Sequence, residues 1–155
     1  MNEKRFFADA MLGNLSRFLR ILGFDTHFRT KEDVQESLKV IQDENRILLT
    51  CSKRLRDIAL KHKCFVIFLE HDTCLEQLKK LKEKTLLEYE VSPEISRCSL
   101  CNGETKEIDV TKLGEKVVPE GTLRHTKRFW QCINCQHIFW EGRHWVNIKK
   151  HMDNI

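Results

Sequence analysis

The chain has 155 residues and a formal net charge of +4, with 41% hydrophobic and 32% charged residues. This length fits one ordinary domain, or a small α/β domain followed by a metal-stabilised module. The first nine residues lack the apolar run of a signal peptide, and no stretch approaches the roughly 20 apolar residues that a membrane span requires. We therefore expect a soluble, intracellular protein.

The first half of the chain alternates short apolar runs with amphipathic stretches. The apolar runs predict strands at residues 5–8, 24–29, 47–50 and 65–69. The amphipathic stretches predict helices that begin near residues 12, 30, 52 and 73. Arg17 and Arg20 are expected to project from the outer side of the first helix, and Gly23 is expected to end it. The alternation predicts an α/β fold, a parallel sheet with flanking helices.

The second half begins after an irregular stretch, residues 88–95, which contains Pro93 and reads as a linker. We expect the chain to divide into a domain of residues 1–92 and a module of residues 93–155. Short strands are expected at residues 107–110, 117–118, 128–131 and 138–140, with a helical turn at 147–152. These strands would form a small antiparallel zinc ribbon.

Two Cys-x-x-Cys pairs, Cys98 with Cys101 and Cys132 with Cys135, are separated by 30 residues. Four thiolates on two facing turns can close a tetrahedron around Zn²⁺, which would then be structural because no ligand position stays open. Gly103 is expected to supply the positive φ at which the first turn reverses. Two disulfides, or four unrelated buried thiols, are the alternatives.

Acidic and hydroxyl side chains follow the ends of the predicted strands. Asp9 comes directly after the first strand, Ser52 shortly after the third, and Asp72 after the fourth. Carboxylates gathered at this edge of a parallel sheet could hold Mg²⁺ or Mn²⁺ and orient water for attack on phosphate. Asp9 is the strongest candidate, because a carboxylate beside a buried strand needs a partner. Asp33 and Asp72 are also candidates, although each could simply favour the start of a helix.

Five short motifs carry a resemblance to a known family. They are FADAMLG (7–13), LRILGFD (19–25), RILLT (46–50), CSLCNG (98–103) and WEGRHW (140–145). The chain resembles the PIN-like RNase domain with a zinc ribbon at the C-terminus of mutator-type 3′–5′ exoribonucleases. The resemblance implies a PIN-like fold, a structural zinc and work on RNA. In animal members it implies attachment to a 3′–5′ exonuclease domain in RNA silencing, in the cytoplasm and its perinuclear granules.

One position departs from the family's pattern. The family commonly has an Asp two residues after the Thr that ends the third strand, and Ser52 stands there in this chain. A hydroxyl does not bring the negative charge that a divalent cation requires. The departure puts catalysis in doubt.

Positive charge gathers near the C-terminus, where six Lys or Arg stand against two acids between residues 122 and 155. Basic residues interleaved with aromatic rings suit phosphates and unstacked bases, although they could also form a solvated face over a small core. We expect two of the three tryptophans to fill that core. The candidate RNA-binding residues are Arg17, Arg20, Lys53, Arg54, Lys127, Arg128, Trp130 and Arg143.

Three functions follow from these patterns. The first is a module of a ribonuclease that binds single-stranded RNA, in RNA silencing or RNA processing. The second is an active metal-dependent endoribonuclease, which the incomplete set of acids weakens. The third is a protein-docking module that recruits a partner through an exposed apolar helix face, which sequence alone does not distinguish from a core face.

Overall fold

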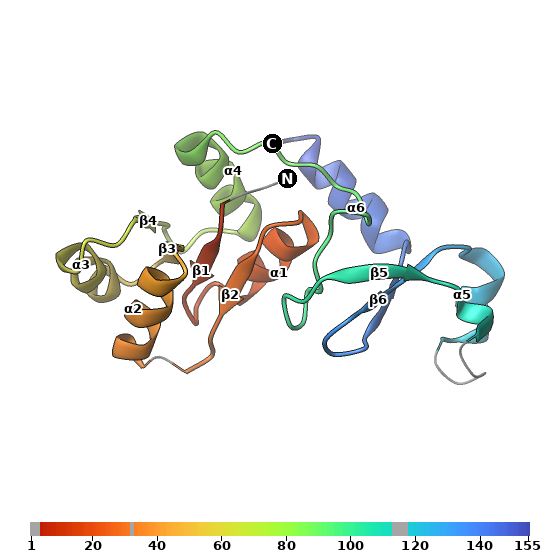
Figure 1. Cartoon of the computed structure of the whole chain (residues 1–155). Helices are drawn as coiled ribbons and strands as arrows, with labels where there is room; N and C mark the ends of the chain where they lie inside the picture. Colours follow the sequence, from red (N-terminus) through yellow and green to blue (C-terminus); the bar gives the residue numbers. More distant parts are fainter. Residues whose placement is uncertain (1–3, 32, 113–117) are drawn as a thin grey trace.

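The computed structural model describes residues 4–31, 33–112 and 118–155, and its first half is a parallel sheet flanked by helices (Figure 1). The strands, in spatial order, are β2 (Thr26–Phe28), β1 (Phe6–Ala8), β3 (Ile47–Thr50) and β4 (Val66–Phe68). The helices that alternate with them are α1 (Gly13–Ile21), α2 (Val34–Asp43), α3 (Lys53–Lys61) and α4 (Cys74–Thr85). The predicted parallel α/β fold is confirmed.

Alternate residues of the central strands face two separate cores. Phe6 and Ala8 belong to a core that α1 and α4 cover, whereas Phe7 belongs to a core that α2 and α3 cover. Successive side chains of a strand point to opposite faces. A sheet that is covered on both sides therefore needs the unbroken apolar runs seen in the sequence.

The turn after α1 depends on Gly23, as the sequence predicts. Gly23 has a φ of 88°, a left-handed conformation that side chains disfavour. A Cβ atom at this position would lie 2.8 Å from the carbonyl oxygen of Ile95. The glycine therefore ends the helix and also lets the linker between the two halves pass close by.

The second half is built on an antiparallel sheet of β5 (Thr105–Ile108), β6 (Phe129–Cys132) and β7 (Ile138–Trp140), paired in that order. A 3₁₀ turn (Val110–Lys112) follows β5 and a short helix, α5 (Glu120–His125), precedes β6; the sequence pattern predicts neither. Of the strand expected at 117–118, Val117 lies outside the described residues and Val118 is a buried residue in a bend. The strand expected at 107–110 is found at Thr105–Ile108, and the predicted small antiparallel sheet is confirmed.

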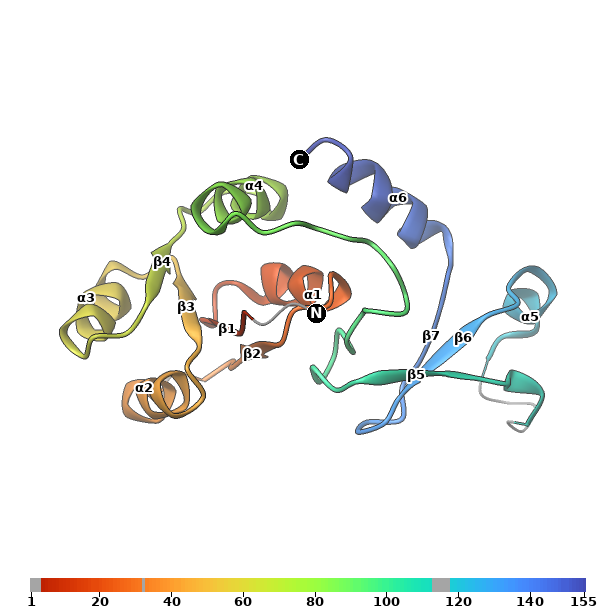
Figure 2. The same ribbon diagram turned by 45° about the horizontal axis from the view of Figure 1, so that its top comes forward.

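Helix α6 (Arg143–Met152) brings the end of the chain back to the parallel sheet (Figure 2). It begins earlier than the helical turn expected at 147–152. Met152 and Ile155 pack against the core that α1 and α4 cover. The two halves are therefore in contact, and a domain boundary at residue 92 stays a prediction. Within the described ranges, no helix combines the length and the apolar character needed to cross a membrane.

Candidate functional site

The four cysteines of the two Cys-x-x-Cys pairs meet at one end of the antiparallel sheet. The Sγ atoms of Cys98 and Cys135 lie 3.6 Å apart, those of Cys101 and Cys132 lie 3.4 Å apart, and all four fall within 4.8 Å of one another. Sulfur ligands about 2.3 Å from a tetrahedral zinc ion lie about 3.8 Å from each other. The cluster therefore fits a structural metal such as zinc. All seven cysteines are free thiols, so the disulfide alternative is not realised.

The first of the two cysteine turns reverses one residue earlier than expected, and the second reverses at the equivalent position. Asn102 and Gln136, each directly after the second cysteine of its pair, have φ values of 68° and 64°. The prediction that Gly103 supplies the positive φ is wrong. Gly103 is required for space instead, because a Cβ atom there would lie 2.8 Å from Sγ of Cys132 and 2.8 Å from Nδ2 of Asn134.

The sulfur atoms differ in how readily they ionise. Burial raises the pKa of the Cys98 thiol to about 12. Burial acts in the same direction on Cys132, but the backbone N–H groups of Cys135 and Asn134 outweigh it and lower the pKa of Cys132 to about 7. Cys132 therefore presents the thiolate that a metal requires more readily than Cys98 does.

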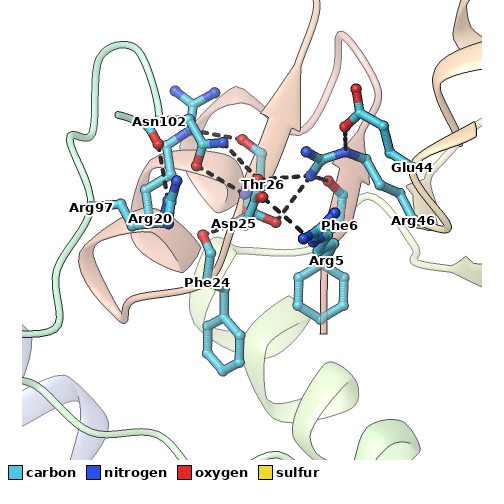
Figure 3. Close-up of polar contacts among 10 residues, drawn as sticks. All are labelled: Arg5, Phe6, Arg20, Phe24, Asp25, Thr26, Glu44, Arg46, Arg97 and Asn102. Atoms are coloured by element: carbon cyan, nitrogen blue, oxygen red, sulfur yellow. Dashed lines mark hydrogen bonds and ion pairs between the residues drawn. The ribbon is translucent and has the colours of Figure 1, made fainter. Parts of the chain in front are cut away.

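A hydrogen-bonded cluster joins the first cysteine turn to the amino ends of the parallel strands (Figure 3). Asn102 accepts a hydrogen bond from the backbone N–H of Thr26 at 2.9 Å and donates one to Oδ1 of Asp25 at 2.7 Å. Arg46, directly before β3, donates to the same oxygen at 2.8 Å. Burial opposes the ionisation of Asp25, but the hydrogen bonds from Arg46 and Asn102 outweigh it and lower the pKa of this carboxyl. Charged hydrogen bonds therefore fasten the cysteine module to the sheet.

Arg20 belongs to the same cluster, and the prediction that it projects from the outer side of α1 is wrong. The residue is only 5% exposed. Its Nε donates to the carbonyl oxygen of Thr26 at 2.9 Å, and its Nη1 donates to those of Ser99 and Leu100 at 3.0 and 3.2 Å. We therefore assign Arg20 to holding the cysteine turn rather than to contacting RNA.

Asp9 lies at the carboxyl end of β1, where the strand order reverses between β1 and β3. Ligands of open α/β sheets bind at such a point. The residue is 1% exposed, and Oδ2 accepts hydrogen bonds from the Thr50 hydroxyl at 2.5 Å and from the N–H of Cys51 at 3.1 Å. Oδ1 accepts one from the N–H of Met11 at 2.8 Å. Protein donors therefore occupy both oxygens of the carboxylate.

The other two candidate catalytic carboxylates also have structural partners. Asp33 caps α2 by accepting hydrogen bonds from two backbone N–H groups at 2.9 and 3.1 Å, and Asp72 pairs with Lys80 at 2.5 Å. Ser52, at the departing position, caps α3 through a backbone N–H at 3.2 Å. Within the described residues, the four cysteines are the only group of three or more potential metal ligands that meet. The three candidate carboxylates therefore do not meet within 4.8 Å of one another, although Asp9 and Asp72 both lie near Cys51, where their charges add to the effect of burial in raising the pKa of its thiol.

The candidate RNA-binding residues fall into separate groups. Lys53 and Arg54 are exposed at the start of α3, which lies at the opposite end of the molecule from β5 and β6 in both views (Figures 1 and 2). Lys127 is exposed directly before β6, and Arg143 is exposed as the first residue of α6. The predicted set is therefore not one continuous patch.

Arg128 and Trp130 make contacts within the protein. The Arg128 guanidinium donates two hydrogen bonds to Glu107, both at 3.0 Å, and a third to Glu94 at 2.7 Å. It also lies 4.9 Å from the centre of the Trp130 ring. Trp130 and Trp145 are 4% and 8% exposed, whereas Trp140 is half-buried, so two of the three tryptophans are largely buried, as expected.

Arg17 lies in a groove between α1 and α6. Asn14 and Arg17 line it from α1, and His144, Asn147 and His151 line it from α6. No acidic residue lines the groove, and Arg17 forms no ion pair with any residue that the structure describes. None of these α6 residues is among the candidates predicted from sequence. His144 lies before the helical turn expected at 147–152, whereas Asn147 and His151 lie within it, and only the spacing of three and four residues, which puts all three on one helix face, could have identified them.

These features define a class of protein: a parallel α/β sheet with flanking helices, followed by a small antiparallel sheet that carries four clustered cysteines. The family model described as "Mut7-C RNAse domain" matches residues 4–152, which include both sheets and all four cysteines. The chain belongs to this family and is an RNase-associated module. Comparisons with curated proteins and with solved structures found no match.

Proposed function

We propose that the chain is the RNA-binding module of a ribonuclease, with single-stranded RNA bound along the groove between α1 and α6. The observation that carries the proposal is the lining of this groove. Arg17 offers a planar guanidinium for phosphate, His144 and His151 offer ring N–H groups, and the side-chain amides of Asn14 and Asn147 can donate hydrogen bonds. Membership of an RNase domain family supports RNA as the ligand.

A structural zinc ion held by the four cysteines has an indirect part in this function. The cysteine turn accepts hydrogen bonds from Arg20, which lies on α1 together with Arg17. The same module carries α6, the second wall of the groove. Zinc would therefore maintain the geometry of the groove without touching RNA or activating water.

Binding is better supported than cleavage. Metal-dependent hydrolysis of phosphate needs carboxylates that are free to coordinate cations. Asp9 is 1% exposed and accepts three protein hydrogen bonds, which leaves little of its carboxylate open to a cation, and Asp33 and Asp72 also have protein partners. Ser52 supplies no negative charge where the family commonly has one. An endoribonuclease that uses Mg²⁺ or Mn²⁺ at Asp9 is therefore the weaker alternative.

The cellular setting of the proposal comes from the family. We propose a role in RNA silencing or RNA processing, in the cytoplasm or its perinuclear granules. The module would act beside a 3′–5′ exonuclease domain in the same polypeptide. In such an arrangement it would retain the RNA while the exonuclease domain cleaves it.

Fluorescence anisotropy with a labelled single-stranded RNA tests the proposal. The affinity should fall as salt rises, because bound phosphates release counterions. Arg17→Ala should weaken binding and reduce the slope of log affinity against log salt by about 0.7, the value for one phosphate contact on a single strand. Lys61→Ala, on the distant helix α3, is the matched control and should change neither. An unchanged slope for Arg17→Ala would count against the groove.

A protein-docking function has one specific observation in its favour. β4 is an edge strand of the parallel sheet, and the residue directly before it, Phe65, is 75% exposed. Leu60, on α3 nearby in sequence, is 54% exposed. Exposed apolar residues beside the outer edge of a sheet suit a protein partner. Recovery of a stoichiometric partner after nuclease treatment, lost in Phe65→Ser, would support docking as a second function.

A further inference from the structure

The antiparallel sheet, α6 and the linker enclose a cavity of about 240 Å³. Aromatic side chains form much of its lining, namely Trp130, Phe139, Trp140 and Trp145. Sites for drug-sized ligands occupy roughly 300 to 1,000 Å³. The cavity is smaller than that range and suits a single flat ring system.

Polar groups accompany the aromatic lining. Arg97, Ser99 and His144 also line the cavity. The indole N–H groups of Trp130 and Trp145 form no hydrogen bond with the described residues, although both residues are more than nine-tenths buried. No fully buried side-chain nitrogen in the described part of the chain lacks a partner. The two N–H groups must therefore keep some access to solvent, and the cavity is the hollow that both residues line.

The cavity adjoins the groove proposed to bind RNA. Ile21, Ser99 and His144 line both the cavity and the groove. A strand whose phosphates lie near Arg17 and His151 would thus pass the opening of an aromatic site. Single-stranded RNA is commonly recognised by turning a base out onto aromatic rings.

We propose that the cavity receives one unstacked nucleobase of the RNA strand held in the groove. The proposal rests on the proposed RNA binding and names the part of the ligand that is recognised. Base stacking would supply the contact with the indole rings, while the indole N–H groups and Ser99 would donate to acceptor atoms on the base edge. The cationic and amide-lined groove beside the cavity favours a nucleotide over an apolar peptide side chain.

Intrinsic tryptophan fluorescence tests the proposal directly, because the chain's only three tryptophans all line the cavity. Nucleoside 5′-monophosphates titrated into the zinc-loaded protein should quench this fluorescence saturably. Ribose 5-phosphate, which has the phosphate but no base, should not. The proposal would be overturned if none of the four nucleotides quenched the fluorescence saturably, or if ribose 5-phosphate quenched it as strongly as they do.

Abasic RNA separates this proposal from RNA binding itself. A hexanucleotide and its fully abasic counterpart carry the same phosphates, so electrostatic binding should be similar. Loss of a stacked base should weaken binding about 5- to 150-fold. Equal affinity for the two strands would overturn the base site and leave RNA binding intact, whereas failure of both strands to bind would refute the proposed function.

A variant that fills the cavity localises the effect. Ser99→Leu would place an apolar side chain in the cavity, and Lys149→Ala, on α6 but lining neither the cavity nor the groove, is the control. The leucine variant should lose nucleotide quenching and bind the hexanucleotide no better than its abasic form, while Lys149→Ala should keep both the quenching and the difference between the two strands. Zinc content checks that the neighbouring cysteine turn is unchanged; if Ser99→Leu loses zinc, the nucleotide and abasic titrations on the native protein decide.

Discussion

The side chain of Asn102 offers the sharpest test of how the cysteine module is attached. Replacing it with glycine keeps the left-handed backbone accessible but removes two hydrogen bonds, one from the buried N–H of Thr26 and one to ionised Asp25. A hydrogen bond to a charged group contributes about 1.5 to 3 kcal/mol, and a neutral one about 1 kcal/mol. Asn102→Gly should therefore lower the free energy of unfolding by about 2.5 to 4 kcal/mol.

Two further variants at the same position separate the causes. Asn102→Ala should cost about 1 kcal/mol more than the glycine variant, because alanine disfavours a positive φ. Asn102→Asp keeps an acceptor for Thr26 but sets a carboxylate against Asp25, so it should be less destabilising when both acids are protonated than at neutral pH.

Urea unfolding with excess zinc, followed by far-UV circular dichroism and tryptophan fluorescence, measures these free energies. Zinc content should stay at one ion per chain in the glycine variant, because the four ligands are untouched. An unfolding free energy for Asn102→Gly within about 0.5 kcal/mol of the native value, the usual effect of a neutral surface substitution, would refute the attachment through this side chain.

Three more perturbations have defined outcomes. Gly103→Ala should lower zinc affinity in a competitive chelator titration, since its Cβ would lie 2.8 Å from Sγ of Cys132, whereas Gly121→Ala, with no atom within 4 Å, should not. The pKa of Asp25 is lowered in the folded protein, so the stability that its carboxylate confers is present above about pH 4 and is lost as the pH falls through the pKa of the folded state. In thermal melts from pH 6 to 3, the melting temperature of Asp25→Asn should therefore fall less than that of the native protein. Asp9→Asn should cost about 2 to 4 kcal/mol in urea unfolding, because an amide NH₂ would face protein donors, and equal stability would show that these bonds contribute little.

Periodicity predicts the parallel half of the fold well, because each strand and helix there has its own apolar pattern. The two Cys-x-x-Cys pairs also predict the cysteine cluster correctly, because the spacing of the four thiols limits how they can meet. Helix boundaries are predicted less well: α2 begins at Val34, where Asp33 caps it, rather than near residue 30. Helix α6 has an apolar face that includes the buried residues Trp145 and Ile148, but its first turn lies before the expected start at residue 147 and is missed.

Contacts between the two halves lie beyond what local patterns predict. Arg20 reads as a surface residue of an amphipathic helix, yet carbonyl oxygens of a turn far along the chain surround it. The positive φ expected at Gly103 occurs at Asn102, and Gly103 instead provides space beside Cys132, which depends on how the second cysteine pair approaches. The cavity of three tryptophans likewise forms only when α6 folds back, so sequence identifies the rings but not the site.

Binding and cleavage measured together on one end-labelled single-stranded RNA, with and without Mn²⁺, test the central claim most directly. We expect zinc-loaded protein to bind the RNA, to release it as salt rises, and to leave it intact in both conditions. Cleavage that requires Mn²⁺ and disappears in Asp9→Asn, while the variant remains folded, would contradict a binding module and establish a metal-dependent ribonuclease.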